Sequence, residues 1–368
     1  MWQRPRMQQI AHLLVANRGE IAIRVLRAAA DLGIRTTAVY TVADATSRHT
    51  AHADVAIELP GSGVGGYLDI EAIIAAATAN GADAIHPGYG FLAENADLAR
   101  ACAAAGITFV GPTSEVLGLF GDKVTARQTA AAAGLPILAG SPGPATVDEA
   151  GALLETHGAI MLKAVAGGGG RGMRAVRTAD ELASAWDRCV SEATKAFGRG
   201  DVYVEQLVQR ARHIEVQIVG DGSAVTHLGE RDCSVQRRNQ KVVEIAPAPN
   251  LPSEVRDQIC AAAVELGRSV SYSSVGTVEF LVNADDPAQF WFIETNARIQ
   301  VEHTITEEVS GVDVVATQLR LAQGATLADL DLTEPPAIRG WAIQARINAE
   351  TIEPSGLTKP SSGTIGVI

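Results

Sequence analysis

The chain has 368 residues, of which 47% are hydrophobic and 4% aromatic, and its formal net charge is −12. One compact core rarely holds a chain of this length, so we expect two or three domains. The acidic balance argues against a nucleic-acid-binding protein, which needs a basic surface to displace counterions. No apolar run approaches the length of a membrane span, so a membrane protein is not expected either.

Four cysteines are scattered through the sequence without the Cys-x-x-Cys spacing of a zinc site: Cys102, Cys189, Cys233 and Cys260. This pattern favours free thiols in a reducing compartment over disulfide bonds or bound zinc. The N-terminus lacks the apolar core of a signal peptide. We therefore expect a cytoplasmic protein.

The first third of the chain alternates between strands and helices, which predicts a parallel sheet with helices on both faces. We expect this domain to end near Gly121. Its first turn, Ala16-Asn-Arg-Gly-Glu20, lacks the G-x-G-x-x-G fingerprint, which weakens a dinucleotide-binding interpretation. The predicted strands cover residues 12–17, 35–41, 84–86 and 107–110. One helix is predicted directly after the turn at Arg18-Gly-Glu20, and two more at residues 69–80 and 95–105.

A segment rich in glycine, proline and serine, residues 134–144, predicts a hinge. The small unit after it is expected to end near Leu207, and an antiparallel pattern follows. The sequence stops at residues 364–368, inside a strand-like run, so we expect a truncated domain. Helices are predicted at residues 147–157, from Ala179, and at 253–268 and 306–322, and strands at 160–165, 173–176, 213–219, 224–229, 275–282 and 289–295.

Four successive glycines begin at Gly167, and Gly167, Gly169 and Gly172 match G-x-G-x-x-G. That fingerprint must open a helix, whereas residues 171–177 alternate like a strand, so we reject the match. A strand, a glycine loop and a second strand instead make a flap whose amides can close over phosphates, with Lys163 placed to meet them. The alternative is a flexible surface hairpin, but the entropic cost of four glycines favours close approach to a ligand.

The strands at residues 275–282 and 289–296 are predicted to form a hairpin in which Glu279 lies opposite Glu294. Facing carboxylates repel, so the pair indicates a bridging cation or one protonated member. Together with Asn296 they form an oxygen-only ligand set, which suits Mg²⁺ or Mn²⁺ bound to nucleotide phosphates. A slipped register with one glutamate in solvent is the alternative.

Residues 292–303 carry a polar group at every second position. If the backbone stays extended, these groups share one strand face. The alternative is a half-exposed edge strand with solvated charges. The five polar residues are Glu294, Asn296, Arg298, Gln300 and Glu302.

Further polar residues favour an anion site in the same domain. His213, Glu215 and Gln217 alternate with apolar residues and so share one strand face. The cationic run at residues 236–241 is a candidate anion pocket, although a solvated charge run is the simpler interpretation. Arg346 lies on another strand-like run and is compatible with a surface position.

A phosphate flap, two phosphate-facing lysines (Lys163, and Lys123 in Gly121-Asp-Lys) and an oxygen-only metal site together describe an ATP-dependent ligase. The sequence resembles the biotin carboxylases of the ATP-grasp superfamily. The core Arg298-Ile-Gln-Val-Glu-His303 is specific to biotin-dependent carboxylases. The other matching motifs are Leu14-Val-Ala-Asn-Arg-Gly-Glu-Ile-Ala22, His86-Pro-Gly-Tyr-Gly-Phe-Leu92, residues 167–173 and Arg237-Arg-Asn-Gln-Lys-Val-Val-Glu244.

This resemblance implies an α/β and α+β architecture in three parts. Residues 1–121 are expected to form a Rossmann-like pre-ATP-grasp domain, the biotin carboxylase N-terminal domain. Residues 122–330 are expected to form the ATP-grasp domain, with a mobile lid at about 135–207. Residues 331–368 are expected to begin a biotin carboxylase C-terminal domain that is incomplete in this chain.

The resemblance also implies roles for individual residues. The ATP phosphates and ribose are assigned to Lys123, Lys163, Gly169, Gly170 and His213. The adenine is assigned to Glu205, Gln206, Leu207 and Val208. Two Mg²⁺ ions are assigned to Glu279 and Glu294, with help from Asn296. Bicarbonate is assigned to Lys241, Arg298, Gln300 and the backbone amide of Val301.

In the chemistry that the family carries out, Glu302 is implied as the base that deprotonates bicarbonate for attack on the γ-phosphate. The product, carboxyphosphate, breaks down to CO₂ and phosphate, and the phosphate takes the proton from biotin. Arg346 is implied to stabilise the biotin enolate, and Tyr89 to line the biotin site. The residues expected to act in catalysis are therefore Arg298, Glu302, Lys241 and Arg346.

Two departures from the family pattern affect these expectations. Family members often carry His where this chain has Asn239, which alters one polar contact near the nucleotide. The strands that close the family's catalytic body beyond residue 368, and an Ala-Met-Lys-Met biotinylation motif, are absent from the sequence. The biotin carrier and the carboxyltransferase are therefore expected on another segment or chain, and a homodimer is a possible assembly.

We interpret the chain as the biotin carboxylase part of a biotin-dependent acyl-CoA carboxylase, with ATP, Mg²⁺ (or Mn²⁺) and biotin as cofactors or substrates. Pyruvate carboxylase and urea carboxylase use the same domain and remain alternatives. So do another ATP-grasp ligase, such as a carbamoyl-phosphate synthase half, and a nucleotide-binding fragment without turnover. A dinucleotide oxidoreductase is the weakest alternative.

Overall fold

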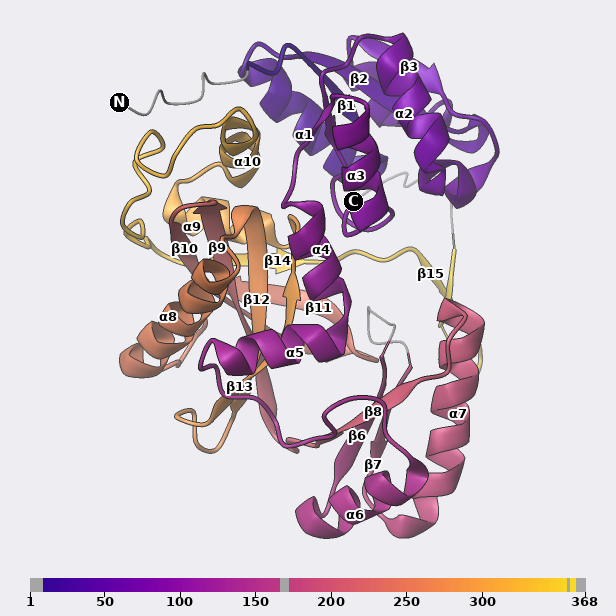
Figure 1. Cartoon of the computed structure of the whole chain (residues 1–368), viewed down its shortest axis with the longest axis vertical. Helices are drawn as coiled ribbons and strands as arrows, with labels where there is room; N and C mark the ends of the chain where they lie inside the picture. The colour runs from indigo at the N-terminus through magenta and orange to yellow at the C-terminus, as the bar shows by residue number, and fades with distance from the viewer. Residues whose placement is uncertain (1–8, 166–171, 356–357, 362–368) are drawn as a thin grey trace.

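The computed structural model describes residues 9–165, 172–355 and 358–361. Three units are visible in Figure 1: a first domain at the top, a central sheet with its helices, and a small lower unit. In the part of the chain that the model describes, no helix is long and apolar enough to cross a membrane.

The first domain is built on a parallel sheet with the strand order β3-β2-β1-β4-β5, as the alternating pattern predicts. Helix α1 (Gly19–Asp31) buries an apolar face against it, and α2 (Ile70–Ala79) and α3 (Ala96–Ala104) follow. The strands are β1 (His12–Val15), β2 (Arg35–Tyr40), β3 (Val55–Glu58), β4 (Ala84–His86) and β5 (Thr108–Phe109). The edge strand β3 was not predicted, because its four residues are only half-buried or exposed and carry little apolar signal.

Two consecutive helices, α4 (Ser114–Gly121) and α5 (Lys123–Ala132), lead into the rest of the chain, and α5 lies across the central sheet in Figure 1. Asp122 separates them: its side chain accepts the Thr125 N–H and caps α5. Lys123 is thereby fixed at the first position of α5.

The small unit is an antiparallel sheet with the order β7-β6-β8, covered by α6 (Val147–His157) and α7 (Ala179–Phe197). Its strands are β6 (Ile160–Ala164), β7 (Met173–Val176) and β8 (Val202–Gln206). The predicted helix at 147–157 and strand at 173–176 are confirmed. The backbone N–H of Ser141, in the predicted hinge, donates to the carbonyl of Val204, so this segment lies along β8.

The central sheet is antiparallel, with the order β13-β12-β9-β10-β11-β14, and α8 (Ser253–Ser269) packs on β9 and β10. Residues Arg238 and Asn239 turn the chain from β10 to β11 with φ angles of 53° and 61°. The strands are β9 (Ala211–Asp221), β10 (Val225–Arg237), β11 (Gln240–Ala246), β12 (Ser273–Asn283), β13 (Phe290–Asn296) and β14 (Ala342–Ala345). A separate pair, β15 (Glu350–Ile352) and β16 (Thr358–Pro360), follows.

Two predictions for this region are wrong. The extended run ends with β13 at Asn296, because Ile299 turns away into the apolar core shared with the first domain. Residues 297–302 form an irregular loop, here called the 297–302 loop, and α9 (His303–Ser310) begins directly after it. The helix predicted at 306–322 is two helices, because the chain turns at Gly311 with φ +72° before Asp313 caps α10 (Val314–Ala322).

Candidate active site

A cavity of about 480 Å³ is lined by residues of the first domain, the small unit and the central sheet. It brings together nearly all the site residues that the sequence predicts, although they come from segments more than 250 residues apart. Gly169 and Gly170 lie outside the described residues. The predicted residues that line it are Tyr89, Lys123, Lys163, Glu205, Gln206, Leu207, Val208, His213, Lys241, Glu279, Glu294, Asn296, Arg298, Gln300, Val301, Glu302 and Arg346.

At one end of the cavity, here called the phosphate end, Glu205 lies between two cations. Its carboxylate forms ion pairs with Lys163 and with Arg127, the latter at 2.5 Å, and all three side chains are buried. Burial opposes ionisation of Glu205, but the two cations hold its pKa below the ordinary value. The sequence did not predict Arg127, and Glu205, expected beside adenine, is already engaged as a counter-charge.

The second lysine of this end, Lys123, lies on α5 with its ammonium 3.8 Å from the Glu294 carboxylate. Helix α5 packs on β13, which explains why a residue at its start reaches this strand. Neither partner is fully buried, with side-chain exposures of 18% and 32%. Lys123 and Glu294 therefore have room to move toward a ligand.

A row of charged residues crosses four strands of the central sheet. Glu279 is directly opposite Glu294 on one side, which confirms the predicted pairing, and directly opposite Glu215 on the other. Glu215 is in turn opposite Arg231. Like charges at facing positions repel, so three adjacent glutamates require cations around them.

Lys241 supplies one such cation at the other end of the cavity, here called the carbon end. Its ammonium donates to Glu215 at 2.5 Å, to Glu302 at 2.7 Å and to Glu279 at 2.9 Å. An ammonium has three N–H donors, so all of them are in use. Burial favours the neutral amine, but the three carboxylates hold the pKa of Lys241 well above its ordinary value.

Glu279 is held by three hydrogen-bond donors and by the imidazole of His213. Besides Lys241, His213 lies 2.8 Å from it, and the side-chain amides of Asn296 and Gln300 donate at 2.9 and 3.1 Å. Burial alone would raise its pKa, but Lys241 and His213 keep it well below the ordinary value. This carboxylate is therefore ionised, as a metal ligand must be.

The predicted metal ligands fit a hard cation by their chemistry. Glu279 and Glu294 face one another across β12 and β13, and Asn296 adds an amide, so the donors are all oxygens. Two arrangements must change for a cation to be held between them. Lys241 must leave Glu279, and the Asn296 amide, which turns its nitrogen to Glu279, must turn its oxygen inward.

Glu302 lies at the end of the 297–302 loop and is bound by two cations. Lys241 donates to one of its oxygens and Arg346 donates to the other at 2.9 Å. Burial would raise the pKa of Glu302, but Lys241, Arg231 and Arg346 lower it to about 2. Arg346 also pairs with the fully buried Glu244 at 2.5 Å, so it is not the free surface residue that the sequence allowed.

Arg298 reaches from the same loop toward the first domain. It donates to the Asn296 side-chain oxygen at 2.9 Å, and its Nε lies 3.3 Å from the Glu94 carboxylate. Burial opposes its charge, but Glu94 and the nearby glutamates raise its pKa. Arg298 thus links the bicarbonate residues expected from the sequence to a carboxylate that the sequence did not suggest.

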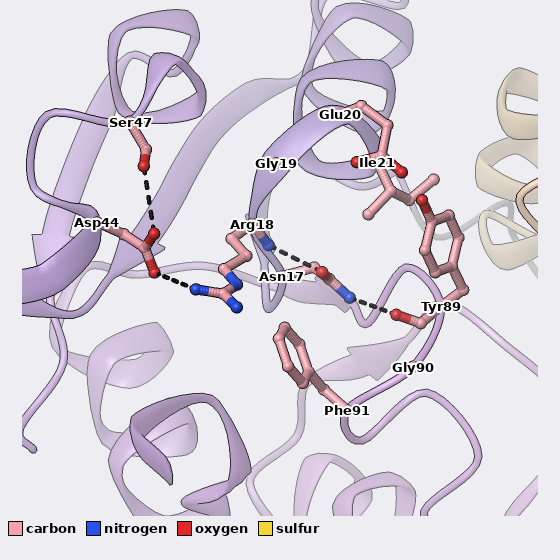
Figure 2. Close-up of a pocket in the computed structure, with 10 residues that line it drawn as sticks. All are labelled: Asn17, Arg18, Gly19, Glu20, Ile21, Asp44, Ser47, Tyr89, Gly90 and Phe91. Atoms are coloured by element: carbon pink, nitrogen blue, oxygen red, sulfur yellow. Dashed lines mark hydrogen bonds and ion pairs between the residues drawn. The ribbon is translucent and has the colours of Figure 1, made fainter. Parts of the chain in front are cut away.

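A second pocket, of about 420 Å³, adjoins the cavity where β1 and β4 end, and Tyr89 and Gly90 line both (Figure 2). Asn17, buried after β1, donates to the carbonyls of Pro87 at 2.7 Å and Tyr89 at 2.8 Å. This part of the first domain therefore fixes the loop that presents Tyr89 to the cavity.

The sequence analysis missed residues that support the site from behind. Arg127 and Arg231 appear in none of the matching motifs, and Glu244 closes one of them without having been assigned a role. Glu215 was placed on the correct strand face, but its role as a partner of Lys241 required the fold. A full strand register would have indicated the charged row, since Arg231 lies directly opposite Glu215.

Comparison with known proteins decides the family. Residues 9–117 match the family described as "Biotin carboxylase, N-terminal domain", and residues 122–330 match "Carbamoyl-phosphate synthase L chain, ATP binding domain". The chain is also similar to the biotin carboxylase domain dimer of 2-oxoglutarate carboxylase from Hydrogenobacter thermophilus. That likeness has a TM-score of 0.89 and 45% identity, over 93% of this chain and 76% of that one. The chain belongs to the biotin carboxylase family.

Biotin carboxylases are ATP-dependent ligases, and members of the family occur as parts of longer proteins. The chain is 50% identical over 369 residues to pyruvate carboxylase from Aspergillus niger, covering 98% of this chain and 31% of that protein. It is 51% identical over 371 residues to pyruvate carboxylase from Bacillus subtilis, covering 97% and 32%. The chain thus spans about a third of the length of these curated relatives.

Proposed function

We propose that the chain carboxylates biotin on a carrier, using ATP and bicarbonate through carboxyphosphate. The observation that supports this best is the single cavity in which lysines for phosphates and the Lys241–Glu302–Arg346 cluster face the same space. A phosphoryl group and the carbon acid that attacks it must be held in line, and a shared cavity allows this.

In the proposed reaction, bicarbonate binds to Lys241, Arg298, Gln300 and the amide of Val301, and Glu302 removes its proton. A carboxylate with a pKa of about 2 is a weak base. Bicarbonate that takes Lys241 as a partner removes part of the cationic stabilisation from Glu302 and so raises its basicity. The same contact lowers the pKa of the bicarbonate hydroxyl. The pKa values of the proton donor, bicarbonate, and the acceptor, Glu302, therefore come closer together.

The deprotonated oxygen then attacks the γ-phosphorus of ATP, and the bond to the β-phosphate oxygen breaks to release ADP. Carboxyphosphate gives CO₂ and phosphate, the phosphate takes the biotin N–H proton, and the nitrogen attacks CO₂. Arg346 holds the negative charge on the biotin oxygen, and Tyr89 lines the biotin site. Glu279, Glu294 and Asn296 would hold Mg²⁺, which when bound would neutralise part of the phosphate charge.

We also propose that the acceptor enzyme is of the pyruvate carboxylase type. The sequence analysis favoured an acyl-CoA carboxylase, but the curated relatives reported above are pyruvate carboxylases and support the alternative better. The biotin carrier and carboxyltransferase then belong to other segments or chains. The H. thermophilus relative is a dimer, which supports a homodimer here. The four cysteines are all free and buried, in keeping with the cytoplasmic location that stays a prediction.

The test is release of ADP by the purified chain with Mg²⁺, bicarbonate and free biotin. We expect turnover that requires bicarbonate and rises with biotin. Tight MgATP binding with no turnover would instead support the nucleotide-binding fragment, and turnover indifferent to biotin would support another ATP-grasp ligase. The acceptor is tested separately with the complete gene product, by fixation of labelled bicarbonate into pyruvate or acetyl-CoA; labelling of acetyl-CoA alone would overturn the pyruvate proposal.

A further inference from the structure

Arg231, on β10, is fully buried behind the wall of the cavity and does not line it. A guanidinium has five N–H donors in fixed directions, and each of them is used. Its hydrogen bonds go to Glu215 at 2.6 Å, Gln217 at 2.9 Å, Thr306 at 2.8 Å, Thr277 at 3.0 Å and Gln300 at 3.1 Å.

These partners connect Arg231 to the three parts of the carbon end. Glu215 holds Lys241 with its other oxygen, at 2.5 Å. Gln300 belongs to the 297–302 loop and lines the cavity. Thr306 lies on α9, which begins directly after Glu302. One buried side chain thus spans a strand, the loop and the helix that follows it.

The charge of Arg231 is also needed where it lies. Glu215 is fully buried between Arg231 and Lys241, and Glu279 and Glu302 share the same lysine. A buried carboxylate without a partner is strongly destabilising. Without Arg231, Glu215 would draw more of Lys241 to itself and away from the ligand side of the cavity.

We propose that Arg231 is a positioning residue for bicarbonate: it orients Lys241, through Glu215, and Gln300 of the 297–302 loop, without touching the substrate. This inference rests on the proposed function. It requires the planar fork of a guanidinium, not only a positive charge, because Arg231 donates to five acceptors and an ammonium has only three donors.

Arg231→Lys tests the inference, since it keeps the charge and removes the fork. We expect the KM for bicarbonate to rise about tenfold or more, while the Kd for MgATP, measured by calorimetry, changes less than about threefold. The matched control is Arg256→Lys. Arg256, on α8, pairs at 2.7 Å with buried Glu230, the neighbour of Arg231 on the same strand, and neither lines the cavity.

A second variant covers the case in which Arg231→Lys does not fold. Thr306→Val removes one acceptor of Arg231 with little change in shape, and we expect a rise of about threefold in the bicarbonate KM. In the double variant, Thr306→Val should cause no further rise in the bicarbonate KM beyond that of Arg231→Lys, because both substitutions act through one contact network.

The outcomes separate this inference from the proposed function. Wild-type chain without bicarbonate-dependent turnover overturns both. Wild-type turnover with an unchanged bicarbonate KM in Arg231→Lys and Thr306→Val overturns the inference alone. An equal rise in Arg256→Lys, or an equal loss of MgATP affinity, also overturns it, since either result shows a general effect on the sheet.

Discussion

The two ends of the cavity solve the burial of charge in opposite ways. At the phosphate end, one carboxylate, Glu205, is held between Lys163 and Arg127. At the carbon end, one ammonium, Lys241, is held among three carboxylates. The first arrangement has two cations for one carboxylate, whereas in the second the Lys241 ammonium has all three donors occupied.

This difference sets what each end can tolerate. A triphosphate carries several negative charges. We expect both Lys123 and Lys163 to neutralise them, so that neither lysine is indispensable. In the proposed reaction, a singly charged bicarbonate competes with three carboxylates for Lys241, so we expect its binding to depend on how exactly these groups are placed. We therefore expect the phosphate end to be robust to single changes and the carbon end to be fragile.

The largest effect is expected from Lys241→Met. It leaves Glu215, Glu279 and Glu302 close together without their shared cation, and removing one partner of a buried ion pair costs about 3–5 kcal/mol. We expect bicarbonate-dependent turnover to fall by a factor of about 100 or more. MgATP binding, measured by calorimetry, should change by less than about fivefold. The exposed Lys195→Met is the control; a similar loss there, or an active Lys241 variant, contradicts the fragile-end comparison.

A buried neutral histidine, His86, joins the end of β4 to α10 and makes the structure sensitive to acid. His86 accepts the Gly88 N–H and contacts Gln318 at 3.0 Å, and burial lowers its pKa from 6.5 to about 4. Above pH 6.5 it is neutral in both the folded and the unfolded chain. As the pH falls below 6.5, the unfolded chain takes up the proton first, so stability is lost until about pH 4.

The expected loss from His86 is about 2 kcal/mol of unfolding free energy between pH 7 and pH 5. Urea unfolding at both pH values measures this loss. Between pH 7 and pH 5, His86→Asn should lose about 2 kcal/mol less unfolding free energy than wild type. Equal slopes for wild type and His86→Asn would show that this histidine is not the acid-sensitive group.

At the phosphate end we expect a smaller effect from Lys163→Met, because Lys123 remains and Arg127 still neutralises Glu205. The Kd for MgATP should rise about tenfold, which corresponds to about 1.4 kcal/mol. In Arg127→Met the Kd for MgATP should rise less, since Arg127 does not line the cavity. Abolished binding in the Lys163 variant would mean that this end is as fragile as the other.

The sequence predicted the site residues better than their geometry, and particular residues show why. Glu279 and Glu294 face one another as predicted, but only because the register shifts between Glu279 and Phe280; nearer the turn Phe280 lies opposite Phe292, and that register alone would set Glu279 opposite Ile293. The polar run through Glu302 was taken as one strand face, but Ile299 is buried in a core formed with the first domain, and no local pattern reveals a distant core. Arg231 escaped prediction for the same reason: its partners lie on β9, β12, the 297–302 loop and α9.

The smallest effect is expected from Asn239→His, which introduces the residue common in the family. Asn239 lines the cavity in the turn after β10 with a φ of 61°, a conformation that both Asn and His adopt more readily than most residues. We expect the MgATP Kd to change by less than about threefold at pH 8.

At pH 6 an imidazole near its ordinary pKa of 6.5 becomes partly cationic, so the variant should bind MgATP more tightly than at pH 8, relative to wild type. Arg238→His, in the same turn but outside the cavity, should show no such change. A pH-independent affinity ratio for Asn239→His would mean that an added cation there does not reach the phosphates, and that the spare positive charge of this end is confined to its lysines.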